Sequence, residues 1–512
     1  MAKMTKRILC ITLALLMLLV SLAACSNDKG DEEESKEQTN NDVVDTGTTT
    51  TPTEDEGDGF DLPDTDWGGR DFTMLVRSAR LDQFGEGDIE FGSSQLDKAI
   101  YERNQKVQTE YNINIKWLTV PDTGADGVKG SDMVLKLDAS ALGGCKDYDA
   151  VAPDYYWKCE TKGYFVNLLT LDYFNFDAPW WWSNWNECYT LDNKLMTCVG
   201  WLTLDIVQGM EVVYFNTQLM EETTDEDVYE LVYNGEWTLD KMIQLSKNAT
   251  YNVQWSGAPG ETGALGDDYV HGTILHYMGL RSLFFSLGGR FANYEDDGSI
   301  TYSFANNKNQ SIVSTLSEWI VGNPEVFYAS YNKVNGHGLG VNERPTDTAE
   351  YFAGNHALFY CYGLRTAELL ASLDMEFGIL PPPTAEEGAE YVTTTFGTSY
   401  FAIERGRSQE QQEFAAFILE ALNYYSYTMV KDVYYEKTLK LQYGGTDVQA
   451  KDMIDMVVER AYLDFAYISQ AGYLIEKVLD CIMNETSLSS VWISNESNVT
   501  SALANYLNGY LK

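Results

Sequence analysis

The amino-acid sequence predicts an exported α/β protein with two lobes. An export signal opens the chain, and strands alternate with helices from residue 70 onward. Residues 67–512 are rich in aromatic and aliphatic side chains, and their 446 positions suffice for a large core. We therefore expect a mainly parallel sheet with crossover helices in the first lobe and a second lobe after it.

The first 24 residues have the pattern of a signal peptide. Lys3, Lys6 and Arg7 precede an apolar run at 8–20 that is too short for a spanning helix. The sequence Leu-Ala-Ala-Cys ending at Cys25 resembles a lipobox, so we expect Cys25 to carry the lipid. Two or more acyl chains would hold the protein stably at the extracellular face of the cell membrane. An ordinary signal peptide with an incidental cysteine is the alternative.

Residues 25–66 form the expected tether. From 26 to 66 the chain has fifteen acidic and two basic residues and almost nothing to bury. Such a segment should stay disordered and extended. The whole chain has a net charge of −42, and removal of the three positive charges of the signal makes it −45. So acidic a surface argues against nucleic acid and anionic lipid as partners.

Hydrophobic periodicity predicts the elements of the folded part in order. The first five are a strand at 70–76, a helix at 96–111, a strand at 112–117, a helix at 133–142 and a buried strand at 148–152. Later strands are expected at 212–216, 357–360, 376–380 and 399–403. Later helices are expected at 225–233, after a Thr238 cap, and at 272–287, 311–321, 408–427, 447–465 and 473–484.

Motifs for catalysis and cofactors are missing from the sequence. His271 and His276 are five residues apart, which does not fit an HExxH zinc site, and there is no GxSxG elbow, P-loop or GxGxxG after a strand. We therefore expect no catalysis, no metal and no cofactor. A carboxylate pair of the glycosidase kind remains an alternative, because the chain has many acidic residues.

Six cysteines remain besides Cys10 and Cys25. Cys188 and Cys198 flank two short predicted strands around an Asp-Asn turn, which makes them candidates for a cross-hairpin disulfide. No CxxC spacing occurs, which disfavours metal binding by these cysteines.

Several segments, taken in order, resemble the extracellular solute-binding proteins of ABC importers, in the group that includes maltose-binding protein. The segments are 148–151, 162–168, 178–181, 213–216, 234–241, 287–291, 296–298, 354–359 and 377–383. The resemblance implies a periplasmic-binding-protein-like (type II) fold with a hinge and discontinuous lobes. We expect the first lobe at 67–205 plus 354–395 and the second at 206–353 plus 396–512. It also implies capture of a small solute by a single chain and delivery to a membrane permease.

Aromatic and charged side chains near predicted strand ends are the candidate ligand contacts. Flat aromatic faces beside polar groups suit a sugar, and ligands of open α/β sheets gather at the carboxyl ends of strands. No family motif supports any one of them individually. The candidates are Arg77, Asp154, Tyr155, Trp157, Trp201, Asp205, Trp255, Tyr362 and Arg365. The alternatives to a sugar-capturing import protein are a tethered carbohydrate-active enzyme and a solute sensor without transport.

Overall fold

The structure is a computed structural model that describes residues 59–85, 94–251, 270–295, 299–329, 345–395, 397–435 and 448–512. All of these residues belong to one unit of the chain, Asp58–Lys512. The expected signal peptide, Cys25, most of the tether and Trp255 lie outside the described residues. None of the helices in the described ranges has the length and apolar character that a membrane span requires.

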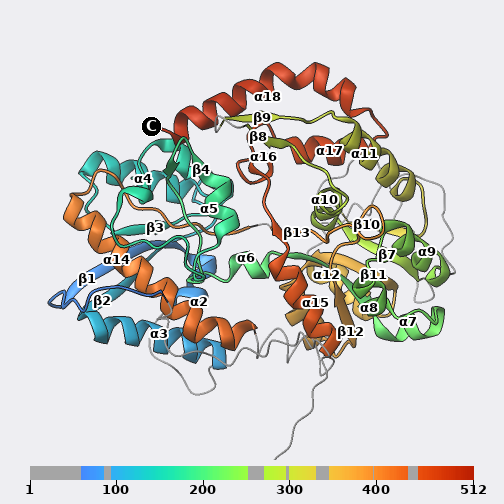
Figure 1. The fold of residues 1–512 in the computed structure, drawn as a ribbon, viewed down its shortest axis with the longest axis horizontal. Coiled ribbons are helices and arrows are strands. Elements are labelled where there is room, and N and C mark those ends of the chain that lie inside the picture. Colours follow the sequence, from blue (N-terminus) through green and yellow to red (C-terminus); the bar gives the residue numbers. More distant parts are fainter. Residues whose placement is uncertain are drawn as a thin grey trace, which may run out of the picture. The chain divides into compact units, whose positions relative to one another are not determined.

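A parallel three-stranded sheet forms from the first part of the chain, in the order β2-β1-β3 (Figure 1). β1 (Arg70–Arg77) pairs along its whole length with β2 (Ile113–Val120) and at its end with β3 (Ala150–Ala152). The crossover helices are α3 (Gln95–Tyr111) and α4 (Ser131–Gly143). The predicted order of the first five elements is confirmed, and it brings the carboxyl ends of β1 and β3 to one edge.

The boundaries of α3 follow from its sequence. The Ser94 side chain accepts a hydrogen bond from the backbone of Asp97, and the Asp97 carboxylate accepts one from the backbone of Ser94. This capping box satisfies two free N–H groups at the start of the helix. The helix ends at Asn112, whose φ of 49° lies in the left-handed region that asparagine tolerates.

A mixed five-stranded sheet forms from the middle of the chain, in the order β10-β7-β11-β6-β12. β11 is buried at all its positions, which fits its central place in the sheet. β10, β7 and β11 are parallel, whereas β6 runs antiparallel to both β11 and β12. The strands are β6 (Glu211–Asn216), β7 (His271–His276), β10 (Val326–Ala329), β11 (Ala357–Gly363) and β12 (Phe377–Leu380).

Strand pairing corrects the expected place of two ranges. Residues 354–395, expected with the first lobe, contain β11 and β12, which pair with β6 in the five-stranded sheet. Residues 397–425, expected with the second lobe, bridge to β3 at Ala402 and include α14 (Gln409–Tyr425), which packs on α3. Periodicity identifies a strand but not its partner, because partners are distant in sequence. The expected strand at 399–403 forms isolated bridges instead.

Helices surround both sheets. The predicted helix at 272–287 is wrong in its first five residues, because β7 occupies 272–276 and α10 begins at Tyr277. Thr238 caps α9 as predicted, since its side chain accepts from the backbone of Lys241. The helices after β6 are α7 (Thr217–Thr223), α8 (Val228–Tyr233), α9 (Leu239–Ala249), α10 (Tyr277–Ser286), α11 (Asn307–Ile320), α12 (Pro345–Ala353) and α13 (Thr366–Ser372).

The C-terminal part is helical, as predicted, but its longest helix was not predicted. α18 (Leu488–Tyr510) packs on η3 (Cys159–Lys162) and on α11 and α17 (Figure 1). Its sequence is rich in serine and asparagine, so tertiary packing stabilises it more than intrinsic propensity does. The other helices of this part are α15 (Val448–Glu459), α16 (Phe465–Ile468) and α17 (Leu474–Met483).

Short elements connect these parts. They are η1 (Ser78–Arg80), α2 (Leu81–Phe84), η2 (Tyr155–Trp157), η4 (Leu168–Thr170), α5 (Ser183–Tyr189), β4 (Thr190–Leu191), β5 (Lys194–Leu195), α6 (Asp205–Gln208), β8 (Ala292–Tyr294), β9 (Ile300–Tyr302), β13 (Thr393–Thr394), η5 (Ser426–Val430) and β14 (Ala461–Tyr462).

The expected disulfide between Cys188 and Cys198 is absent, and both are free, buried thiols. The predicted hairpin does form, as β4 and β5. Its register pairs Thr190 with Leu195, so the continued ladder would place Cys188 opposite Thr197 rather than Cys198. Cys188 also lies in α5, before the hairpin begins. The pairing prediction failed because it assumed that the strands extended to both cysteines.

Candidate functional site

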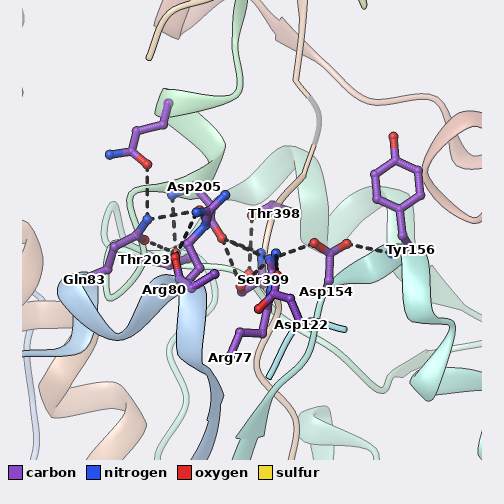
Figure 2. A network of polar contacts seen from close by, with 12 residues as sticks. Arg77, Arg80, Gln83, Asp122, Asp154, Tyr156, Thr203, Asp205, Thr398 and Ser399 are labelled. Carbon is purple, nitrogen blue, oxygen red and sulfur yellow. Dashed lines mark hydrogen bonds and ion pairs between the residues drawn. The ribbon is translucent and has the colours of Figure 1, made fainter. Parts of the chain in front are cut away.

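The ends of β1 and β3 carry a buried ion-pair network, which we call the Arg77 network (Figure 2). Arg77 is the last residue of β1, and Asp154 lies just beyond β3. Arg77 Nη1 lies 2.7 Å from Asp154 Oδ2, and Arg77 Nη2 lies 2.8 Å from Asp122 Oδ2. The network consists of Arg77, Arg80, Gln83, Asp122, Asp154, Asp205 and Ser399.

Asp205, at the start of α6, is the most completely bonded member of the network. Its side chain is fully buried. Oδ1 lies 2.5 Å from Arg80 Nε, and Oδ2 accepts from the backbone and hydroxyl of Ser399 at 3.1 and 2.9 Å. Burial alone would raise the pKa of Asp205, but the charges of Arg80 and Arg77 outweigh burial and lower it. Asp205 is therefore held as a carboxylate that anchors several elements.

The structure brings three predicted residues, Arg77, Asp154 and Asp205, into this one network. Burial raises the pKa of Asp154 even though Arg77 opposes that shift. A buried charge needs an opposite charge or hydrogen bonds to offset its loss of hydration, and here other side chains of the network supply most of these. The network therefore fixes the ends of β1 and β3 relative to α6.

Tyr155 and Trp157, two further predicted residues, lie in η2 directly after Asp154. Tyr155 is buried, whereas Trp157 is half-buried and its ring lies 5.2 Å from the Arg77 guanidinium. A Cβ on Gly130 would come within 2.3 Å of the Trp157 indole, so glycine allows the indole to lie against the backbone. Trp157 thus has a fixed place and retains some exposed surface.

The remaining predicted residues come from other elements. Trp201 is buried, with its ring stacked on Trp182 at 5.5 Å and Lys431 Nζ 5.6 Å from it. Tyr362, at the end of β11, packs edge-on against His276 at 4.2 Å. Arg365 follows β11 and is half-buried; burial and the charge of Arg80 lower its pKa.

Sequence analysis missed a second set of polar residues, which we call the Glu211 cluster: Tyr156, Glu211, Arg281 and Glu476. Arg281, on α10, donates from Nη1 to Tyr156 Oη at 3.3 Å and pairs through Nη2 with Glu476 Oε1 at 3.0 Å. These contacts connect η2, which follows β3, with α10 and α17. Arg281 and Glu476 interrupt largely apolar runs, whereas no pattern in the sequence singles out Tyr156 or Glu211.

Glu211, the first residue of β6, is unusual within the described part of the chain. Only 2% of its surface is exposed, yet neither carboxylate oxygen has a hydrogen-bond partner there. Burial raises the pKa of Glu211 to about 8, and the charges of Arg281 and Arg365 oppose that shift only in part. Arg281 Nε and Glu476 Oε2 also have no hydrogen-bond partner among the described residues. Unsatisfied donors and acceptors therefore gather in one place.

The described residues include no group of three or more His, Cys, Asp or Glu side chains that could hold a metal ion. In the Arg77 network, arginines occupy the carboxylates that a cation would need. What the arrangement offers is hydrogen bonding to a polar molecule: a buried carboxylate, a guanidinium, a phenol and an indole face.

Comparisons with solved structures identify the fold. The cyclic alpha-maltosyl-1,6-maltose binding protein from Arthrobacter globiformis superposes with a TM-score of 0.54 at 15% identity, over 86% of this chain and 100% of that protein. An ABC substrate-binding protein from Listeria monocytogenes, in complex with cycloalternan, has a TM-score of 0.53 at 13% identity. The superposition covers 85% of this chain and 99% of that protein. UgpB from Mycobacterium tuberculosis, in complex with glycerophosphocholine, has a TM-score of 0.52 at 16% identity. The superposition covers 83% of this chain and 100% of that protein. No protein-family model and no curated protein matches the sequence.

The chain therefore has the type II periplasmic-binding-protein fold, an α/β architecture with two discontinuous lobes and a hinge. This likeness agrees with the fold that the resemblance in the sequence implies.

Proposed function

We propose that this chain captures a solute between its two lobes and delivers it to an ABC permease without altering it. The observation that carries the proposal is the Glu211 cluster, in which buried polar atoms lack partners among the described residues and which reaches η2, just beyond the end of β3. An unsatisfied buried polar group costs about 1–3 kcal/mol, so a solute that bonds to it gains much of that free energy. A fully bonded cluster would offer no such gain.

A sugar or oligosaccharide is the solute class that fits these side chains best. Carboxylate and guanidinium groups bond to ring hydroxyls, and the half-buried indole of Trp157 suits the apolar face of a sugar ring. Two of the similar structures support this class: one is a complex with cycloalternan, and the other is a cyclic alpha-maltosyl-1,6-maltose binding protein. The glycerophosphocholine complex extends the panel of solutes that deserve testing.

We propose lobes that follow the two sheets. One comprises the β2-β1-β3 sheet with α3, α4 and α14, and the other comprises the five-stranded sheet with α7–α13 and α15. Two crossings between them, at 205–211 and near 395, contact each other: Met210 bridges to Thr395, and Thr395 Oγ1 donates to Ile206 O at 2.7 Å. A solute that binds both lobes shifts the hinge equilibrium toward closure, and the closed form is what the permease would recognise.

Anchoring through Cys25 completes the proposal. A lipid on Cys25, followed by the acidic tether, would hold the binding domain outside the cell membrane near the permease. Mass spectrometry of the mature N-terminal peptide tests this step: a diacylglyceryl-modified Cys25 is expected, and Cys25→Ala should release the protein into the medium.

Calorimetry against a panel of sugars, oligosaccharides and glycerophosphocholine tests solute capture. Binding near micromolar affinity corresponds to about 8 kcal/mol, which several hydrogen bonds and one stacked ring can supply. One-site heat with an unchanged solute afterwards, analysed by mass spectrometry, is the expected result. Product formation would contradict the proposal and favour an enzyme.

A further inference from the structure

A cavity of about 540 Å³ lies between α18, the loop that precedes α17, and the turn after Trp157. Its lining includes no member of the Glu211 cluster. One wall is a face of α18 that presents Asn498 and Asn505, and the opposite wall includes Lys158, Tyr473 and Lys477. This volume can hold a small polar molecule.

The charge of this cavity is opposite to that of the chain. Acidic residues outnumber basic ones by 77 to 35 in the sequence, yet Lys158, Lys477 and Lys512 line the cavity and no described lining residue is Asp or Glu. Among the described residues, no Asp or Glu forms an ion pair with any of these three lysines. The lysines therefore concentrate positive charge in the cavity, and the acidic groups that act on Lys158 and Lys477, Glu160 and Asp480, lie outside its lining.

Lys158 is held in place rather than free in solvent. Its Nζ donates to Gln470 O at 3.1 Å and lies 4.5 Å from the centre of the Tyr473 ring. Lys158 and Lys477 are both half-buried. An ammonium group with three donors, one of them already directed to a carbonyl, retains two donors for a ligand. Little side-chain entropy is then lost when an anion binds.

We propose that this cavity is a second binding site, which accepts an oxyanion: a phosphate, sulfate or carboxylate group. Lysine ammonium groups bind such oxygens as point charges, and the amides of Asn498 and Asn505 add neutral donors. The group could be a free anion or the acidic end of a sugar, since both present the same oxygens. The site shares no residue with the Glu211 cluster, so either site can fail without the other.

Calorimetric titration of the full mature chain with inorganic phosphate, and separately with digalacturonate, tests the proposal at constant ionic strength in chloride. We expect one-site binding of at least one probe. Binding of phosphate indicates a free anion, and binding of digalacturonate alone indicates an anion carried by a sugar. Failure of both probes to bind would overturn the proposal.

Three variants locate the binding. The double variant Lys158→Gln/Lys477→Gln should weaken it about tenfold or more, because two charge-assisted contacts are lost. Asn505→Trp keeps every charge and fills the cavity, so it should weaken binding as well. Lys136→Gln, which removes an exposed charge on α4, should leave the affinity unchanged. Equal affinity in all three variants and the wild type would show that the anion does not bind in this cavity, and it would contradict the proposal.

Discussion

The Arg77 network and the Glu211 cluster are both buried and charged, but they differ in how completely their atoms are bonded. In the network, Asp205 is bonded by arginine, glutamine, serine and backbone groups. In the cluster, Glu211 has no hydrogen-bond partner among the described residues although it is equally buried. The difference teaches that burial of charge alone does not identify a binding site. Buried polar atoms without hydrogen-bond partners do identify one, because a solute gains binding free energy when it supplies the missing partners.

The largest expected effect concerns stability. Asp205→Ala should lower the free energy of unfolding by about 3–5 kcal/mol, because it leaves the Arg80 and Arg77 charges buried without their carboxylate. Denaturation with urea, followed by fluorescence, measures the loss. Asp122→Ala is the matched control: this carboxylate is 30% exposed and should cost about 1 kcal/mol or less. An equal loss of unfolding free energy in both variants would show that the buried Asp205 stabilises the network no more than the partly exposed Asp122 does.

The next effect separates binding from stability at the cluster. At pH 9, where Glu211 is ionised, Glu211→Gln should weaken solute binding about 10- to 100-fold, since a hydrogen bond to a charged group contributes about 1.5–3 kcal/mol. It should not lower the midpoint of thermal unfolding, because no existing bond is lost. Calorimetry and thermal unfolding measure the two quantities.

Glu420 offers the matched control for that variant. It is also a buried glutamate with a raised pKa, about 7, because burial outweighs the indole N–H groups of Trp180 and Trp181 that it accepts at 2.8 and 2.9 Å. Glu420→Gln should therefore reduce stability and leave solute affinity unchanged. Reversed outcomes for the two glutamates would contradict the comparison.

The pH dependence of stability sharpens the comparison further. Burial raises the pKa of Glu211 to about 8 from an ordinary 4.5. Between these values the folded chain keeps a proton that the unfolded chain releases, so this group's contribution to stability is complete below pH 4.5 and is lost as pH rises through 8. The unfolding midpoint should fall by on the order of 2–3 °C between pH 6 and pH 9, and the fall should be smaller in Glu211→Gln. Identical pH profiles would show that Glu211 does not titrate in this window.

The smallest effect belongs to the aromatic contact. Trp157→Ala should weaken sugar binding about five- to tenfold, because a stacked ring contributes roughly 0.5–1.5 kcal/mol beyond its buried area. Trp157→Phe, which retains an aromatic face, should recover part of the loss. Unchanged affinity in Trp157→Ala, measured by calorimetry, would exclude stacking at this position.

Local structure was readable from the sequence where one segment suffices to determine it. The alternation from β1 to β3 and the Thr238 cap of α9 depend on neighbouring residues, and both are confirmed. The place of β11 was misjudged because it depends on pairing with β6, which lies far away in the sequence. α18 was missed because its serines and asparagines are weak helix formers and its stability comes from packing on η3.

The candidate site was predictable only in part, for the same reason. Strand ends correctly predicted that Arg77 and Asp154 lie close together, because parallel strands place their carboxyl ends together. Their contact with a ligand stays a prediction. No sequence pattern shows that Arg281 reaches Tyr156, since the two residues belong to elements 125 positions apart. That Glu211 lacks a partner is a property of the packed structure alone.

A crystal structure with a bound solute from the calorimetric panel tests the central claim most directly. The account predicts the solute between the two sheets, with at least one solute hydroxyl bonded to the Glu211 carboxylate and a ring near Trp157. A solute bound elsewhere, with both Glu211 oxygens still unbonded, would contradict it.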